Sequence, residues 1–493
     1  MVSPETRSKY TATIGIECHV QLKTATKLFD AVGNDAREAE PNTLVGPLSF
    51  GLPGTLPVLN KEAVHLAMRA AYALATVPQK FSTFDRKHYF YPDLPLGYQI
   101  TQFEHPIILG GEVTVDVNGE PKRIGITRAH IEADAGKSTH PAGKDYSLVD
   151  LNRAGTPLLE IVSEPDMHTA AEAKAYAHEL YLRMRFADVS DCNLYYGNMR
   201  FDVNVSVSTT DQLGTRSESK NLNSFRSVEK AVEYEIERQI ELLEKGEKIV
   251  QETRGWDDAK QRTFSQRSKE DAHDYRYFPD PDIPPIELSD DHIAAVAAEI
   301  PVMPDVWRTR LVTLGIDKPS MESLLEAELD DPAVNYLALI EEVIEDKEFA
   351  KILANWFVNI EVPLRRDDAQ TPNAALTNQG RLHMYRTVNE LVKANKLSST
   401  NAKALIAKIL TGTEQIQDVE AFAKQHNMIQ ESDSGAIDAI VKKVIEENPK
   451  AAEDVRGGEM KAIGFLVGQI MKQSQGRANP GMAQELIKKQ LGL

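Results

Sequence analysis

The repeating pattern of apolar residues changes once along this chain, and that change restricts the fold more than any other feature. Between Tyr10 and about Pro285, short runs of alternating residues are separated by glycine, proline and aspartate turns. One such run, Val113–Val117, ends in an Asn-Gly pair that is typical of a tight hairpin turn. After Asp290, leucine, alanine, glutamate and lysine dominate, as in helices. This order predicts an α+β fold with helical C-terminal domains.

A chain of 493 residues is too long for a single ordinary core, and composition suggests where it divides. One long helix is expected at 228–244, where apolar residues recur every three or four positions, with Gly246 placed to end it. A glycine and polar residues near 410–413 separate two amphipathic regions. We therefore predict domains at 1–292, 293–411 and 412–493.

The charge and cysteine content limit the functional class. The net charge of −18 argues against a protein that coats nucleic acid along its whole surface. A local basic region that binds nucleic acid is still compatible with this net charge. Two cysteines, Cys18 and Cys192, are too few for a disulfide framework, and no stretch of about 20 apolar residues is present. A cytoplasmic protein with no membrane association is expected.

The last 35 residues are locally basic, because five basic side chains outnumber two acidic ones to give +3. Asn479-Pro480 is typical of a helix start, and a terminal helix is expected at 480–491. A basic end on an acidic protein is a place to expect nucleic-acid contact, although a solvated helix face is equally common. The candidate contact residues are Lys461, Lys472, Arg477, Lys488 and Lys489.

Three acidic segments carry the candidate chemistry. Glu160 lies within the aliphatic run Leu158–Val162, where a carboxylate needs a cation or hydrogen-bond donors unless it points out from a half-exposed strand. In the run 14–22, strict alternation places Glu17 and His19 on one strand face, which suits either a divalent cation such as Mg²⁺ or a plain polar surface. Glu132 belongs to the third segment.

Phosphate-binding groups are harder to place. Gly136-Lys137-Ser138 imitates the end of a P-loop, but Ile131 stands where the first glycine is required. Any ATP site must therefore use dispersed cations. The candidates nearest the acidic segments are Lys137, Arg153, Arg200 and Lys220, each of which alone is more often a salt-bridging surface residue.

Five longer motifs together resemble the B subunit of the aspartyl/glutamyl-tRNA amidotransferase, the GatB family. The resemblance runs from about Tyr10 to the C-terminus. It is carried by the segments ECHVQL at 17–22, KHYFYPDLP at 87–95 with GYQI at 97–100, 150–166, KNLNSF at 220–225 and HDYRYFP at 273–279.

This resemblance implies a cradle-like catalytic domain, a helical domain and a small helical tail domain that binds tRNA. It implies ATP-dependent activation of glutamate on tRNA(Gln), or aspartate on tRNA(Asn), followed by amidation with ammonia. An acyl phosphate is the expected intermediate, because a free carboxylate has no leaving group. By the same resemblance, Glu17, His19, Glu132 and Glu160 are assigned as catalytic and Mg²⁺-binding residues.

The resemblance also implies partners, since no amidase signature is visible in this chain. The expected partners are the amidase-type A subunit, which is the glutaminase, and the small C subunit, with misacylated tRNA as substrate. Two departures stand out. Ala133 replaces a second acid found in many relatives, so coordination is expected to use an extra water or Asp134. The segment 47–54 lacks the cysteines of some relatives, so no structural zinc is expected.

Two alternatives belong to other classes of function. One is a noncatalytic tRNA-binding scaffold whose partner performs all the chemistry. The other is an unrelated metal-dependent hydrolase using Glu17 and His19, which requires an open metal position and works without tRNA.

Overall fold

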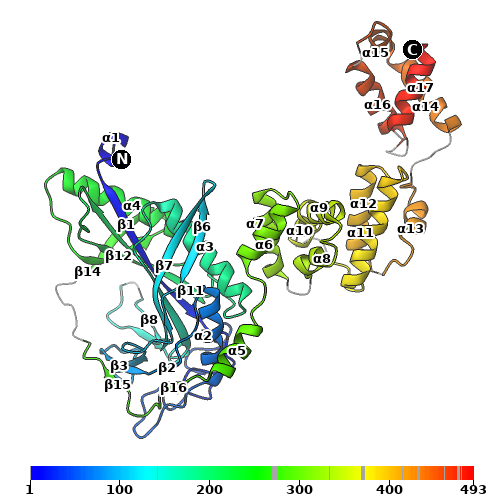
Figure 1. The fold of residues 1–493 in the computed structure, drawn as a ribbon. Helices are drawn as coiled ribbons and strands as arrows, with labels where there is room; N and C mark the ends of the chain where they lie inside the picture. The colour runs from blue at the N-terminus through cyan, green and yellow to red at the C-terminus, as the bar shows by residue number, and fades with distance from the viewer. Residues whose placement is uncertain are drawn as a thin grey trace. The chain divides into compact units, whose positions relative to one another are not determined.

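The computed structural model describes residues 2–141, 143–268, 275–331, 334–367, 372–413, 415–429, 434–459, 461–474, 478 and 480–493. The chain separates into two compact units, Met1–Pro304 and Asp305–Leu493. The first unit is built on β-sheets, and the described part of the second is helical (Figure 1). The predicted α+β fold, with a β-rich N-terminal domain followed by helices, is confirmed. The three predicted domains, 1–292, 293–411 and 412–493, stay predictions.

The largest sheet in the described part of the first unit has nine strands. Its order is β14-β13-β12-β11-β1-β10-β7-β5, and β6 pairs with β7. The pairs are antiparallel except for β12 with β13. The strands are β1 Thr11–Gln21, β5 Ile108–Leu109, β6 Glu112–Val117, β7 Glu120–Ala133, β10 Pro157–Ser163, β11 Met199–Ser208, β12 Ser217–Leu222, β13 Glu252–Asp257 and β14 Arg262–Ser268.

Shorter elements surround this sheet. Three small sheets join β15 with β3 and β4, β16 with β2, and β8 with β9. Their strands are β2 Phe81–Ser82, β3 Asp85–His88, β4 Tyr98–Thr101, β8 Lys137–Thr139, β9 Leu148–Asp150, β15 Phe278–Pro279 and β16 Ile286–Glu287. The helices of this unit are α1 Pro4–Arg7, α2 Lys61–Ala73, α3 Ala170–Phe186, α4 Phe225–Glu244 and α5 Asp290–Ala298.

The residues of strand β1 alternate between an apolar face and a polar face of the sheet. Its alternate residues Ile14, Ile16 and Cys18 are buried in the core, together with the apolar side of α3 and α4. The intervening residues, among them Glu17 and His19, are only partly buried and face the other side. Because β1 lies between β10 and β11, this polar face belongs to the middle of the sheet and not to an edge.

Two local predictions are confirmed. The helix expected at 228–244 is α4, which begins three residues earlier, and the Ser224 hydroxyl accepts a hydrogen bond from the Ser227 amide at its start. Gly246 adopts a φ of 76° just beyond its end, as a glycine C-cap does. Asn118 and Gly119 form the two-residue turn between β6 and β7, both with positive φ.

The described part of the second unit contains helices and one π-helical turn, η2. Residues between 437 and 491 form an apolar core of their own. The predicted terminal helix is confirmed as α17, whereas Asn479 lies outside the described residues. The elements are α6 Pro304–Thr313, α7 Lys318–Asp330, α8 Tyr336–Glu342, α9 Lys347–Trp356, η2 Phe357–Glu361, α10 Val362–Arg365, α11 Asn378–Lys393, α12 Ser399–Leu410, α13 Val419–Gln425, α14 Ser434–Glu447, α15 Pro449–Arg456, α16 Lys461–Gln473 and α17 Pro480–Leu491.

Across the described residues of both units, no helix combines the length and the apolar character needed to cross a lipid bilayer.

Candidate active site

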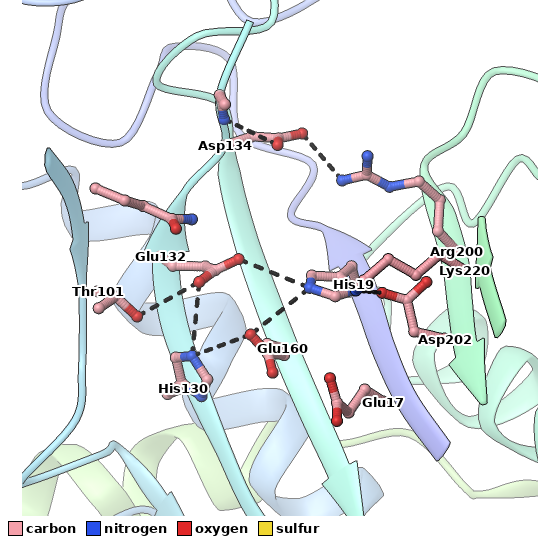
Figure 2. Close-up of polar contacts among 12 residues, drawn as sticks. Glu17, His19, Thr101, His130, Glu132, Asp134, Glu160, Arg200, Asp202 and Lys220 are labelled. Atoms are coloured by element: carbon pink, nitrogen blue, oxygen red, sulfur yellow. Dashed lines mark hydrogen bonds and ion pairs between the residues drawn. The ribbon is translucent and has the colours of Figure 1, made fainter. Parts of the chain in front are cut away.

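One histidine and two glutamates meet on the polar face of the large sheet (Figure 2). His19 on β1 lies directly opposite Glu160 on β10, and its Nε2 is 3.6 Å from Glu160 Oε2. Glu132 on β7 approaches the same imidazole, with Oε1 3.9 Å from Nε2. One ligand atom from each of the three residues lies within 4.8 Å of the others, so they can share a single cation.

A second imidazole, that of His130, contacts both glutamates of this group. It lies opposite Glu160 on β7, and its Nε2 is 3.4 Å from Glu160 Oε2 and 3.7 Å from Glu132 Oε2. Thr101 on β4 donates a hydrogen bond of 3.4 Å to Glu132 Oε2. His130 therefore contacts both carboxylates, and Thr101 contacts Glu132 as well. Such neighbouring groups usually orient the ligands of a metal.

The charges in this group are strongly coupled. Burial alone would lower the pKa of His19, but the Glu160 carboxylate raises it to about 9. Burial would raise the pKa of Glu160, yet His130 and then His19 hold it well below its usual range. The cluster therefore keeps Glu160 as a carboxylate, which is the form that binds cations.

Glu17 falls into a neighbouring group and not into the three-residue cluster. It lies two residues before His19 on β1, opposite Asp202 on β11, and groups with Asp202 and Glu218 within 4.8 Å. Asn204 Nδ2 donates a 3.0 Å hydrogen bond to Glu17 Oε1. Burial, followed by the charges of Glu160 and Glu218, raises the pKa of Glu17. The four residues assigned together thus lie on one face but form two adjacent sets.

Three of the four candidate cations are held by carboxylates of this face. Arg200 Nη2 and Arg153 Nε lie 3.1 Å and 3.2 Å from the same oxygen, Oδ2 of Asp134. Lys220 Nζ lies 2.7 Å from Asp202 Oδ2 and 3.0 Å from Glu218 Oε1.

The fourth candidate cation, Lys137 on β8, is exposed, and among the described residues it forms no ion pair with these carboxylates. Asp134, raised above as a substitute ligand beside Ala133, is instead the common partner of two arginines.

The donor set fits a divalent cation. Two carboxylates and one imidazole supply three ligand atoms, so water and substrate oxygens are needed to complete an octahedral shell. Oxygen donors suit Mg²⁺, and the imidazole suits transition ions as well.

Of the five candidate tail residues, four are described. Lys461 and Lys472 belong to α16, Lys488 and Lys489 to α17, and three of these side chains are exposed while Lys488 is half-buried. Arg477 lies outside the described residues.

Three residues of the site were missed by sequence reasoning. His130 stands two positions before Glu132, and this spacing places both on one strand face. Asp202 alternates with Arg200 in the same way on β11. Glu218 alternates with Lys220 on β12, but its proximity to Glu17 depends on pairing between distant strands.

Two protein-family models match this chain, one within each compact unit. The model of the GatB/GatE catalytic domain matches residues 12–294, and that of the GatB domain matches residues 338–491. The carboxylate and imidazole cluster thus lies inside a sequence region typical of a catalytic amidotransferase domain.

Similar proteins are aspartyl/glutamyl-tRNA(Asn/Gln) amidotransferase B subunits. That of Carboxydothermus hydrogenoformans is 42% identical over 490 residues, covering 98% of this chain and 99% of the relative. Those of Brevibacillus brevis and Dehalococcoides mccartyi are 42% and 43% identical over 493 and 494 residues, with the same coverage. The chain belongs to the GatB family. The catalytic-domain match argues against a purely noncatalytic scaffold.

Proposed function

We propose that this chain activates and amidates Glu-tRNA(Gln), Asp-tRNA(Asn) or both, in an ATP-dependent reaction that yields Gln-tRNA(Gln) or Asn-tRNA(Asn). Full-length similarity to aspartyl/glutamyl-tRNA(Asn/Gln) amidotransferase B subunits and the catalytic-domain match support amidation. The observation that carries the chemical part is the convergence of His19, Glu132 and Glu160 on one face of the sheet. The cytoplasm is the expected compartment.

The reaction needs two displacements. A side-chain carboxylate oxygen attacks the γ-phosphorus of ATP, forming an acyl phosphate as ADP leaves. Ammonia then attacks the acyl carbon, phosphate leaves, and loss of a proton gives the amide.

The chain's residues supply positioning and charge for these steps. His19, Glu132 and Glu160 would hold Mg²⁺, which supplies positive charge beside the transferred phosphoryl group. Arg200 and Arg153 present two guanidinium groups at the rim of the cluster, where their shared partner Asp134 orients them for anionic substrate groups.

Ammonia is proposed to come from a partner. A nucleophilic cysteine needs a lowered pKa, but Cys18 and Cys192 are fully buried and burial raises the pKa of both thiols, that of Cys192 to about 12. The name of the relatives as B subunits fits a multi-subunit complex. The amidase-type A subunit, in the role of glutaminase, and the small C subunit complete the proposal.

The C-terminal helices are proposed to bind tRNA. Lys461, Lys472 and Lys489 are exposed on a segment whose local charge is opposite to that of the whole chain.

Substitution of the cluster tests the proposed function. In the assembled complex, His19→Ala or Glu160→Gln should reduce amidation of Glu-tRNA(Gln) and Asp-tRNA(Asn) by at least about a hundredfold, because one cation ligand is lost. Glutaminase activity of the same preparation should persist. Lys260→Ala, an exposed lysine that pairs with Asp257 in the turn between β13 and β14, is the comparison variant. Normal amidation by either cluster variant would reject the site.

The same assay separates the hydrolase alternative. If substrate turnover required the cluster but proceeded without tRNA and without ATP, the chain would be a hydrolase and the proposed function would be wrong.

A further inference from the structure

Two tyrosines are exposed on a turn that leads into the candidate active site. Tyr195 and Tyr196 are 89% and 45% exposed, and Tyr195 is more exposed than any other large hydrophobic side chain in the described part of the chain. The two rings meet edge to face, with centroids 5.2 Å apart and planes at 81° to each other. Exposed aromatic rings that are held in place are typical of recognition surfaces.

The turn that carries the tyrosines is fixed at both ends. The backbone N–H of Asn198 donates a 2.9 Å hydrogen bond to the carbonyl oxygen of Asn193, which closes the loop. Leu194 packs against the apolar core of the first unit. Gly197 adopts a φ of 72° just before the chain enters β11. The two rings lie between these anchors, so a ligand that binds them orders little additional backbone.

An arginine supports the second ring. The Arg37 guanidinium lies 6.0 Å from the centre of the Tyr196 ring. Arg37 is itself held by Asp35, at 2.7 Å, and by Asp191, at 3.5 Å. Because two carboxylates surround this one guanidinium, the turn does not favour a phosphate group, and the flat rings are the surface that it offers to a ligand.

The turn leads directly to the polar face of the sheet. Asn198 Nδ2 donates a 2.9 Å hydrogen bond to Gln21 Oε1 at the end of β1. Arg200 follows Tyr196 by four residues and lies opposite His19 (Figure 2). Four extended residues span at most about 14 Å, so one extended substrate can contact the rings while its end lies at the cluster.

The size of this surface favours a small aromatic ligand over a protein. Within residues 186–200, Tyr195 and Tyr196 are the only large apolar side chains that are exposed. Two rings offer far less than the roughly 800 Å² that each partner buries in a standard protein–protein interface. A nucleobase needs only one ring face, and unpaired bases of RNA are commonly held by stacking on tyrosine.

We propose that Tyr195 and Tyr196 bind unpaired nucleobases at the 3′ end of the substrate tRNA by stacking. The proposal rests on the proposed function, which brings the aminoacyl end to the cluster, and it assigns the residues that hold the adjoining single strand. Tyr195 receives a base on its open face, and Tyr196 supports that ring edge to face.

Removal of the exposed ring tests this placement. In the assembled complex, Tyr195→Ala should raise the KM for aminoacyl-tRNA at least about fivefold, the lower end of the effect of losing one base stack, and leave kcat within about twofold. Tyr195→Phe should match the wild type because it keeps the ring, whereas Tyr195→Leu should resemble the alanine variant. Phe264→Ala removes an exposed ring from β14, three strands away from β11, and is the matched control.

A shortened tRNA identifies the part of the RNA that the ring contacts. Filter binding compares intact uncharged tRNA with tRNA whose unpaired 3′-terminal nucleotides have been removed. Tyr195→Ala should bind the intact tRNA at least about fivefold more weakly than the wild type does, and both should bind the shortened tRNA equally, because ring and bases form one interaction.

Three results would overturn the proposal. The first is a KM and a tRNA affinity of Tyr195→Ala equal to those of the wild type. The second is equal weakening for intact and shortened tRNA, because the ring would then contact another part of the RNA. The third is loss of assembly of Tyr195→Ala with its partner subunits in size-exclusion chromatography, because the rings would then form a protein contact.

Failure of the proposed function gives a different result. In that case the wild-type complex would amidate neither aminoacyl-tRNA in the presence of ATP. The comparison of intact with shortened tRNA measures binding alone, so it would still decide whether the tyrosines hold the 3′ end.

Discussion

A buried ion pair in the second unit allows a quantitative prediction. Glu361, the last residue of η2, has a side chain that is 1% exposed, and that of Arg381 on α11 is 2% exposed. Arg381 Nη2 and Arg365 Nε both lie 2.9 Å from Glu361 Oε1. The Tyr385 hydroxyl donates a 2.7 Å hydrogen bond to Glu361 Oε2. A single carboxylate therefore compensates one fully buried guanidinium, a second partly buried one and a buried phenol.

Glu361→Gln removes that charge while preserving the shape of the side chain. Arg381 then remains buried with only neutral hydrogen-bond acceptors, the Val334 carbonyl and the Asn378 amide, and loss of one member of such a pair costs about 3–5 kcal/mol. For a unit of this size, about 2–4 °C of melting temperature is lost per kcal/mol, so its transition should fall by about 6–20 °C. Calorimetry of the full chain, with hydrogen exchange of peptides from 336–391 to identify the unit, measures the effect.

The triple variant Glu361→Leu, Arg381→Met, Tyr385→Phe is the control. It removes the two fully buried charges and the phenol together, so only the partly exposed Arg365 loses Glu361 as a partner. Because Arg365 also pairs with Asp331, most of the lost stability should return. Tyr385→Phe alone should cost about 1–2 kcal/mol. The reasoning would be refuted if Glu361→Gln unfolded within about 1 kcal/mol of the wild type, or if the triple variant were less stable than the single one.

Two further perturbations have defined outcomes. Burial lowers the pKa of Lys27 to about 8, below its unfolded value, so its charge destabilises the fold below pH 8 and this penalty disappears as pH rises toward about 10.4. Lys27→Met should therefore stabilise the protein by about 2–3 kcal/mol at pH 7 and by little at pH 10.5, which denaturant titrations at both pH values would reveal. Removal of the residues after Gly412 should weaken tRNA binding and make the affinity less dependent on salt concentration. Filter binding between roughly 50 and 200 mM salt, where phosphate contacts matter, measures both effects. If the truncated and the full chain bound tRNA equally well over this range, the tail assignment would be wrong.

The elements that carry the site could be predicted because their signals are local. Alternation along 14–22 predicts correctly that Glu17 and His19 share a face. The aliphatic run around Glu160 predicts a strand and a need for partners, and the partners are His19 and His130. Both inferences use only neighbouring residues.

The grouping of those side chains could not be predicted in the same way. Alternation places Glu17 and His19 on one face, but it says nothing of the strand that lies alongside. Glu17 joins Asp202 and Glu218 because β11 and β12 pair in one particular register. Arg153 reaches Asp134 from a turn, and no periodic pattern describes a turn. Long-range pairing and loop geometry therefore account for what the sequence left open.

Four strands contribute to one transverse row of the site: Arg200, His19, Glu160 and His130 are consecutive partners across β11, β1, β10 and β7. A shift of any one strand by a single residue would turn its member of the row into the core and bring a core side chain, such as Cys18 on β1 or Phe201 on β11, to the polar face. Insertions and deletions should therefore be tolerated in the connecting loops and eliminated from the strands. Amidation activity then reports that the sheet has folded in its correct alignment, which spectroscopic measures of strand content do not detect.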